Sequence, residues 1–318
     1  SGGEACAIAV RIGRAASGKD KVAFCGYHGW HDWYLAANLS DDDSLGRHLI
    51  PGLEPNGVPQ ALRGTSLPFQ FNDLEGLEKL FDANPDIGVI YMEPQRSTPP
   101  EPGFLEGVRT LAAERGAVLI FDECTSGFRR SLGGLHLHYG VEPDIATFGK
   151  SLGNGYAITA IIGREEVMQA AQSTFISSTF WTERIGPSAA LAALEVMRKE
   201  EAPQQVHQIG ESVQERWRML ADSYGMDVTL GGLPALASFT INHLDLNSVK
   251  TYITERMLNR GYLAGASLYA SLAHRPEILD DYFAALDPLF GELSNLDNEG
   301  LRAKLPSGLA QSGFRRLT

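Results

Sequence analysis

The segment "AVLIFD" (117–122) carries the clearest structural signal in the chain. Its hydrophobic residues run almost without interruption up to Asp122. A strand that is half exposed alternates hydrophobic and polar side chains, whereas a strand covered on both faces is hydrophobic throughout. The segment therefore predicts a buried strand of a parallel sheet. It also places the Asp122 carboxylate at the edge where ligands of open α/β sheets bind.

Neighbouring segments extend this sheet in both directions along the chain. Further short hydrophobic runs that predict strands are "KVAFC" (21–25), "IGVIYM" (87–92), "IATFG" (145–149) and "AIIG" (160–163). Between two of the strands, residues 103–116 place hydrophobic side chains at helical spacing. Strand, helix and strand in this order predict right-handed crossovers and a largely parallel sheet of the α/β class.

Both ends of the chain show helical patterns. Residues 4–16 predict an amphipathic helix after the glycine-rich "SGG", and because the chain opens directly on this element, we expect an earlier N-terminal part to be missing. From about residue 187 onward, long helical patterns surround the strand-like "LASFTI" (236–241), which is an α+β arrangement. We therefore expect a large domain over residues 1–200 and a smaller one over residues 201–318.

Composition excludes several classes of function. The formal net charge is -12 and basic residues are not clustered, which argues against nucleic-acid binding. No hydrophobic stretch approaches the roughly 18 residues that predict a membrane span, and no signal peptide opens the chain. Cys6, Cys25 and Cys124 lack zinc-site spacing and are odd in number, so we expect no metal site and a reducing, cytoplasmic environment.

Lys150 in "DIATFGKSLGNG" (144–155) allows two interpretations. A nucleotide-binding phosphate loop requires Gly-x-x-x-x-Gly-Lys-Ser/Thr, and the leading glycine position is occupied here by Asp144. The nucleotide interpretation therefore fails on spacing. The alternative is a lysine at the end of a strand that forms a Schiff base with an aldehyde cofactor such as pyridoxal 5'-phosphate (PLP).

A PLP lysine needs three kinds of support, and the sequence offers all three. Asp122 supplies a carboxylate that keeps the pyridine nitrogen protonated, and Tyr27 in "GYHGWHD" follows a strand and offers a ring for stacking. Gly2 and Gly3 at a helix start supply unobstructed backbone amides for a phosphate. Each residue alone also has an ordinary structural explanation. Their conjunction, in this order and with Lys150, favours the PLP interpretation.

At this point the chain resembles the class III PLP-dependent aminotransferases of fold type I, and especially their glutamate-1-semialdehyde aminomutase-like branch. The blocks that carry the resemblance are "SGGEACAIAVRIGRAASGKDKV", "GYHGWHD", "VLIFDECTSGFR", "GGLHLHYGVEPDIATFGKSLGNG", "SSTFW" and "ASLYASLAHRPEILDDYFAAL". They run through nearly the whole chain. The resemblance implies a PLP-binding large domain with a mostly parallel sheet flanked by helices, and a smaller α+β C-terminal domain.

Carried over by position, the resemblance implies that Lys150 forms the internal aldimine and that Asp122 pairs with the pyridinium nitrogen. Thr179 would reach the phosphate of a neighbouring subunit, so a homodimer with shared active sites is expected. The full set of implied cofactor-binding residues is Gly2, Gly3, Tyr27, His28, Glu93, Asp122, Cys124, Lys150 and Thr179, of which Lys150, Asp122 and Tyr27 are the implied catalytic residues.

The expected reaction is transfer of an amino group between an amine or amino acid and a carbonyl compound. An aminomutase or racemase would use the same residues, and a non-catalytic relative is a third alternative. The segment "QRSTPPEP" (95–102) departs from the family pattern and removes an asparagine often found near the ring hydroxyl. Arg96, Arg129 and Arg130 are candidates for binding a substrate carboxylate, and the identity of donor and acceptor stays open.

Overall fold

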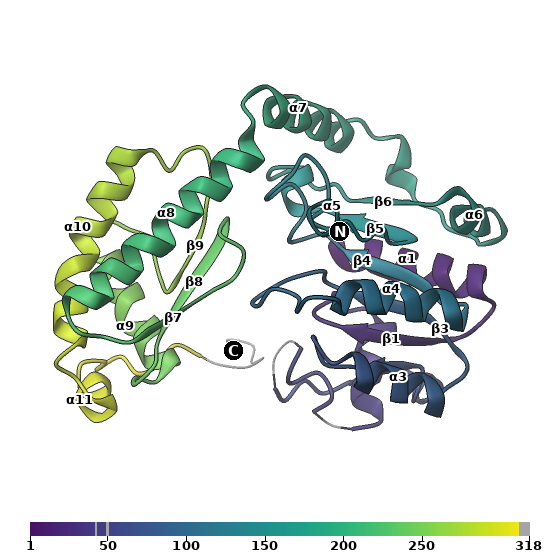
Figure 1. Cartoon of the computed structure of the whole chain (residues 1–318), viewed down its shortest axis with the longest axis horizontal. Helices are drawn as coiled ribbons and strands as arrows, with labels where there is room; N and C mark the ends of the chain where they lie inside the picture. Colours follow the sequence, from purple (N-terminus) through teal and green to yellow (C-terminus); the bar gives the residue numbers. More distant parts are fainter. Residues whose placement is uncertain (42, 49–50, 312–318) are drawn as a thin grey trace. The chain divides into compact units, whose positions relative to one another are not determined.

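The computed structural model of the protein (Figure 1) describes residues 1–41, 43–48 and 51–311. They divide into two compact units, the first covering residues 1–201 and the second beginning at Ala202. Each unit has its own sheet and its own hydrophobic core. Each is therefore described by itself.

The first unit is built on a six-stranded sheet with the order β2-β1-β3-β4-β5-β6. Its strands are β1 (Lys21–Cys25), β2 (Ser66–Pro68), β3 (Ile87–Met92), β4 (Val118–Asp122), β5 (Ile145–Phe148) and β6 (Ala160–Gly163). The first five strands pair in parallel, and β6 runs antiparallel to β5. The α/β class with a mostly parallel sheet is thus confirmed.

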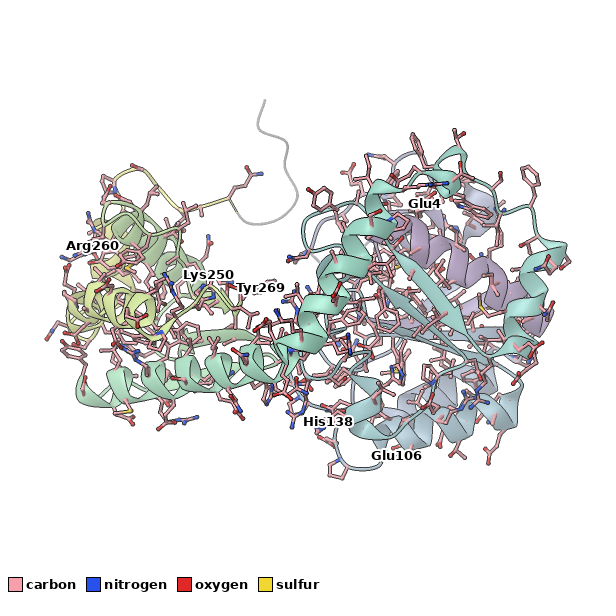
Figure 2. The ribbon with its side chains drawn as sticks, turned by 90° about the horizontal axis from the view of Figure 1, so that it is seen from above. Glu4, Glu106, His138, Lys250, Arg260 and Tyr269 are labelled. Atoms are coloured by element: carbon pink, nitrogen blue, oxygen red, sulfur yellow. The ribbon has the colours of Figure 1, made fainter. Side chains whose placement is uncertain are left out.

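Helices cover both faces of this sheet. The helices of the unit are α1 (Gly2–Ser17), α2 (Asp32–Leu35), α3 (Leu74–Ala83), α4 (Phe104–Arg115), α5 (His136–Tyr139), α6 (Glu165–Met168) and α7 (Ile185–Lys199). Short 3-10 turns are η1 (Ala36–Leu39), η2 (Gln60–Leu62), η3 (Lys150–Leu152), η4 (Gln169–Ser173) and η5 (Thr179–Thr182). In Figure 2, Glu4 on α1 and Glu106 on α4 lie on opposite sides of the sheet.

Strand β3 shows why the central strands are hydrophobic throughout. Successive side chains of a strand point to opposite faces. Val89 and Tyr91 pack in the core that contains α1, whereas Ile90 and Met92 pack in the core that contains α3 and α4. All six residues of β3 are buried. A polar side chain in the middle of this strand would be buried on either face, where it needs a hydrogen-bond partner.

The second unit has a three-stranded antiparallel sheet, order β7-β8-β9, covered by helices. Its elements are α8 (Ala202–Ser223), β7 (Val228–Gly231), β8 (Leu236–Ile241), α9 (Leu246–Leu258), β9 (Ser267–Tyr269), α10 (Pro276–Leu293) and α11 (Asn298–Ala303). Ala237, Phe239 and Ile241 alternate into a core around Trp217. The described residues include no helix long and apolar enough to span a bilayer.

Candidate active site

Asp122 ends β4 and is the centre of a buried hydrogen-bond network. It is only 4% exposed. Its Oδ2 atom lies 2.8 Å from Nδ1 of His28 and accepts a weak bond from Cys6 Sγ at 3.6 Å. Its Oδ1 atom accepts hydrogen bonds from the backbone amide of Cys124 at 3.0 Å and from the Thr147 hydroxyl at 3.3 Å. The carboxylate is thus fixed in orientation by donors on both oxygens.

The contacts of His28 indicate that its imidazole is the cationic partner of Asp122. Nδ1 faces the carboxylate, and Nε2 lies 3.1 Å from the carbonyl oxygen of Cys25. Both of these groups only accept, so both ring nitrogens must donate, which is the hydrogen-bonding pattern of imidazolium. Burial alone would raise the pKa of Asp122, but the hydrogen bond and charge of His28 and the amide of Cys124 outweigh it and lower the pKa. Asp122 therefore stays negatively charged inside the protein.

Lys150 follows β5 in an unusual backbone conformation. Its φ angle is 40°, in the left-handed region that costs a non-glycine residue about 1 kcal/mol. Its side chain is exposed, and Nζ donates to Oγ1 of Thr125 at 2.6 Å. Strained backbone of this kind is concentrated at functional sites. The strain here is consistent with a lysine held at a chosen position at the end of the sheet.

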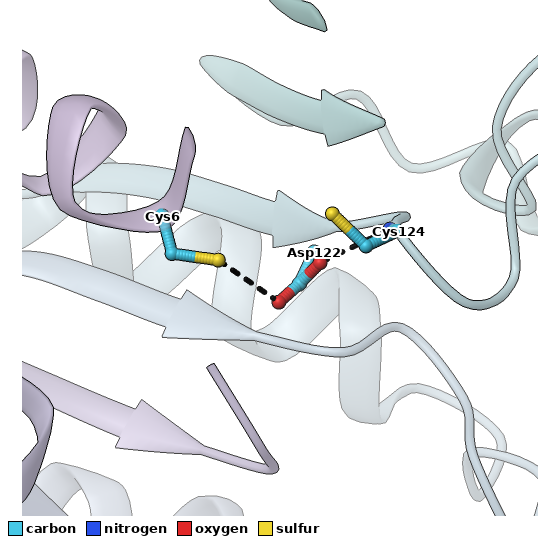
Figure 3. A group of neighbouring side chains, drawn as sticks. All are labelled: Cys6, Asp122 and Cys124. Atoms are coloured by element: carbon cyan, nitrogen blue, oxygen red, sulfur yellow. Dashed lines mark hydrogen bonds between the residues drawn. The ribbon is translucent and has the colours of Figure 1, made fainter. Parts of the chain in front are cut away.

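The thiol of Cys124 marks the place where three segments converge. A methyl group placed on Gly2 would lie 3.9 Å from Cys124 Sγ, and one placed on Gly149 would lie 3.5 Å from it. The start of α1, the end of β5 and the loop after β4 therefore meet around one sulfur atom. Figure 3 shows Cys124 beside Asp122, with Cys6 of α1 also directed at this carboxylate. The structure thus brings the predicted residues Gly2, Asp122 and Cys124 together.

The loop that carries Tyr27 packs directly on the start of α1. A methyl group on Gly29 would lie only 2.5 Å from the Cα atom of Gly3, and Gly29 has a φ of +91°. Only glycine satisfies both requirements. The first amides of a helix lack acceptors within the helix and carry the positive end of its dipole. Gly2 and Gly3 therefore offer an anion site close to the Tyr27 loop.

Glu93 follows β3 and holds the Tyr27 loop from the other side. It is 6% exposed, and its Oε2 atom accepts the backbone amide of Tyr27 at 3.2 Å. Burial raises its pKa, although Arg96, whose Nη1 lies 3.6 Å from Oε2, works in the opposite direction. Arg96 and Arg47 also line a polar cavity of about 330 Å³ next to Glu93. Glu93 therefore positions the backbone of the Tyr27 loop and also faces the cavity lined by Arg47 and Arg96.

Not all predicted residues join this group. Thr179 is exposed in η5, and no hydrogen bond or ion pair among the described residues links it to Lys150 or Asp122. His28 is fully buried behind Asp122, so the contact it makes is with the carboxylate. Cofactor contacts by these two residues stay predictions.

Three residues of the network were not identified from the sequence: Cys6, Thr125 and Thr147. Thr147 had a weak signal, because it is a polar residue inside the hydrophobic run of β5. It is fully buried and shares a hydrogen bond with the hydroxyl of Tyr91 at 3.1 Å. Cys6 and Thr125 had no comparable signal, since small side chains of their kind are common in helices and loops.

Comparison with known proteins identifies the family. The family model described as aminotransferase class-III matches residues 1–267, and the chain belongs to this family. A 3-aminobutyryl-CoA aminotransferase from Cloacimonas acidaminovorans (strain Evry) is 35% identical over 263 residues, which cover 80% of this chain and 59% of that protein. The chain thus spans less than two thirds of the length of this relative. The aminotransferase family expected from the sequence is confirmed.

Solved structures support the same fold. The structure of the PLP internal aldimine form of FumI from Sphingopyxis sp. MTA144 matches with a TM-score of 0.80 at 21% identity. The match covers 92% of this chain and 69% of the FumI chain. An omega-transaminase from Sphaerobacter thermophilus has a TM-score of 0.79 at 22% identity, covering 93% and 73%. These similarities show that the chain has the fold type I architecture of PLP-dependent transaminases.

The described residues fit the cofactor of this family. A buried carboxylate kept negative by an imidazolium suits a protonated pyridine nitrogen. Free amides at the start of α1 suit a phosphate, and an exposed lysine at the end of β5 suits an aldehyde. The expectation of PLP as the cofactor is thus confirmed at the level of the family.

Proposed function

We propose that this chain carries the cofactor site of a PLP-dependent transaminase that moves an amino group between an amine or amino acid and a carbonyl compound. The observation that carries the proposal is the buried Asp122–His28 pair at the end of β4. A buried carboxylate without a partner tends to become neutral, and a neutral acid would not keep a pyridine nitrogen protonated. Here the cationic partner holds the charge. We also propose residues 1–200 as the PLP-binding domain.

When bound, PLP supplies an electron sink for the negative charge that develops beside an amine nitrogen. The residues of the chain supply proton control around it. Asp122 would accept a hydrogen bond from the ring nitrogen, and it stays charged because its pKa is lowered. Lys150 Nζ would hold the cofactor through its aldehyde and, when its amine is free, would take up and return a proton beside the substrate. Thr125 Oγ1 accepts from Nζ and keeps the amine near the site.

The remaining predicted residues have supporting roles in this proposal. The backbone amides of Gly2 and Gly3 would donate hydrogen bonds to the phosphate, and Glu93 fixes the loop from which Tyr27 would stack on the ring. Cys124 would lie near the opposite side of the ring. Thr179 would contribute to the phosphate site of a second copy.

A homodimer is proposed as the working unit. Large apolar side chains are exposed over one continuous segment of the first unit: Phe175 (89%), Phe180 (75%), Trp181 (63%), Ile185 (69%) and Leu191 (70%). Exposed patches of this kind mark interfaces in soluble proteins. The segment contains Thr179, so a second copy seated here would bring that residue to a shared site. We propose a cytoplasmic location, which suits three free cysteines.

The named substrate of the curated relative suggests where to begin with substrates. That relative is a 3-aminobutyryl-CoA aminotransferase, and an amine on the β-carbon of an acyl compound is the first donor to test here. The aminomutase-like branch is the alternative. A separate keto product and an accumulated amine form of the cofactor would indicate transamination, whereas an isomerised amine with no keto product would indicate the alternative.

The direct test is a visible spectrum with and without PLP, followed by borohydride reduction and location of the modified lysine. We expect the label on Lys150. Lys150→Ala should abolish labelling and turnover, and Lys79→Ala, an exposed lysine paired with Glu75, should leave both intact. Normal transamination by the Lys150→Ala variant would refute the proposal.

A further inference from the structure

Two cysteines from distant parts of the sequence meet at Asp122. The sulfur atoms of Cys6 and Cys124 and a carboxylate oxygen of Asp122 all lie within 4.8 Å of one another. Cys6 reaches the carboxylate through its thiol, and Cys124 through its backbone amide (Figure 3). Both cysteines are free. This leaves two reduced sulfur atoms side by side at the proposed cofactor site.

The two thiols differ in accessibility. Cys6 is 2% exposed on the inner face of α1, whereas Cys124 is partly exposed in the loop after β4. The hydrogen bond with Cys124, burial and the charge of Asp122 together raise the pKa of Cys6 well above its ordinary value. Oxidants attack thiolates at accessible positions. Cys124 is therefore the sulfur that an oxidant reaches first. Cys6 is the neighbouring thiol that can then react with oxidised Cys124.

We propose that Cys6 and Cys124 form a reversible disulfide when the protein meets a peroxide. Cys124 thiolate attacks hydrogen peroxide, which gives a sulfenic acid on Cys124 and hydroxide, and a proton turns the hydroxide into water. Cys6 sulfur then attacks the sulfenic sulfur and a second water leaves. The Cys6 proton passes by way of Oδ2 of Asp122, which accepts the hydrogen bond of this thiol, to the departing hydroxide, so the second water forms and Asp122 ends as a carboxylate. In sum, two thiols and one peroxide give one disulfide and two waters.

The geometry permits this bond within one chain. A disulfide needs its sulfur atoms about 2.05 Å apart. The two sulfurs lie within 4.8 Å of each other and must move closer together for the bond to form. The bond would tie α1, which carries Gly2 and Gly3, to the loop beside Asp122. Under the proposed function, this cross-link occupies the place where the cofactor must be held and lowers PLP uptake.

Cys25 is a matched internal control. It is 5% exposed at the end of β1, and burial, with the charge of Glu93, raises its pKa to about 12. It does not belong to the group formed by Cys6, Asp122 and Cys124. Oxidation that reflected only general reactivity would treat it like Cys6, since both are buried. Oxidation guided by the geometry should leave it as a thiol.

The test uses cofactor-free protein treated with hydrogen peroxide in the presence of a chelator, then alkylated under denaturing conditions and digested. We expect a peptide pair joined through Cys6 and Cys124, a free thiol on Cys25, and full reversal by a dithiol. Cys6→Ala and Cys124→Ala should each abolish the joined pair, and Cys25→Ala should keep it. Uptake of PLP, followed by absorbance, should fall at least tenfold in the cross-linked protein and return after reduction.

Three outcomes would overturn the proposal: a dimedone-trapped sulfenic acid on Cys124 that never resolves, a cross-link only between separate chains, or a joined pair that includes Cys25. Unchanged PLP uptake by fully cross-linked protein would overturn the blocking effect. Reduced protein that fails to bind PLP would refute the proposed function, while the peptide map would still decide on the disulfide.

Discussion

Nδ1 of His28 lies 2.8 Å from Oδ2 of Asp122, and both side chains are almost completely buried. The ring also reaches the carbonyl oxygen of Cys25, so it is oriented at both nitrogens. This pair places a fixed negative charge at the end of β4. Its energetic and functional consequences can be measured separately.

Replacing His28 should destabilise the protein and weaken cofactor binding together. His28→Ala leaves Asp122 as a buried charge without its partner, and the loss of a buried pair typically costs about 3 kcal/mol. We expect that decrease in the free energy of unfolding, measured by urea denaturation, and a weaker PLP affinity in titration. His243→Ala, an exposed histidine of the second unit, should change neither quantity. Wild-type PLP affinity in the His28 variant would contradict the proposed role.

The free energy of unfolding of the first unit should decrease at low pH because Asp122 becomes protonated. The pKa of this carboxyl in the folded state lies below its ordinary value of 3.8. A carboxyl whose pKa is lowered by folding stabilises the folded state at pH values above its pKa in the unfolded chain. This contribution disappears as the pH falls through its pKa in the folded state. Urea denaturation between pH 5 and about 2 should therefore show a loss of stability that Asp122→Asn reduces. Asp20→Asn, an exposed control, should retain the wild-type pH dependence.

Thr125 should affect the rate more than the binding of the cofactor. Its hydroxyl oxygen accepts a hydrogen bond from Nζ of Lys150 at 2.6 Å. Thr125→Val removes this hydrogen bond, which positions the amine. Hydrogen bonds to charged groups contribute about 1.5 kcal/mol, which corresponds to about a tenfold fall in kcat. Steady-state kinetics would show this, and Thr125→Ser should restore most of the rate. An equal loss in both variants would indicate that the methyl group matters instead.

Gly29 should tolerate no side chain. Gly29→Ala places a methyl group 2.5 Å from the Cα atom of Gly3 and also strains a residue with φ of +91°. The Tyr27 loop must then move away from the start of α1, and we expect a weaker PLP affinity with a loss of stability above 1 kcal/mol, which is about the strain term alone. Gly57→Ala has the same type of backbone, φ +87°, but open space, so it measures the strain without the clash. Equal effects in both variants would remove the clash from the explanation.

The exposed apolar segment should control the oligomeric state. Trp181→Glu introduces a charge into the proposed interface, and a buried unpaired charge opposes association strongly. We expect wild-type protein to be dimeric and the variant monomeric by size-exclusion chromatography with light scattering. Leu263→Glu alters an apolar residue that is 96% exposed in the second unit, and it should leave the dimer intact. A monomeric wild type would refute the proposed dimer directly.

Much of the fold was predictable because the central strands are short, hydrophobic and well separated. The segments expected for β1 and β3 match the observed strands at both ends, and the helix expected over residues 103–116 is α4 (Phe104–Arg115). By contrast, β2 (Ser66–Pro68) has only three residues and ends in proline, so its pairing with β1 gives little signal in sequence. The antiparallel direction of β6 could not be predicted from the sequence, because so short a hydrophobic run is the same in parallel and antiparallel strands.

The sequence by itself determined most of the sheet, with Asp122 at the end of one strand and Lys150 shortly after another, since a continuous hydrophobic run marks a buried strand and leaves charged groups at its ends. Tertiary structure alone decided which groups act on those residues. His28 and Cys6 are 94 and 116 positions from Asp122, and no local pattern encodes contacts over such separations. They meet because α1 packs on β4 and because His28 follows β1, which is separated from β4 only by β3 in the same parallel sheet. The charge of Asp122 and the closeness of the two thiols are therefore properties of the packed core.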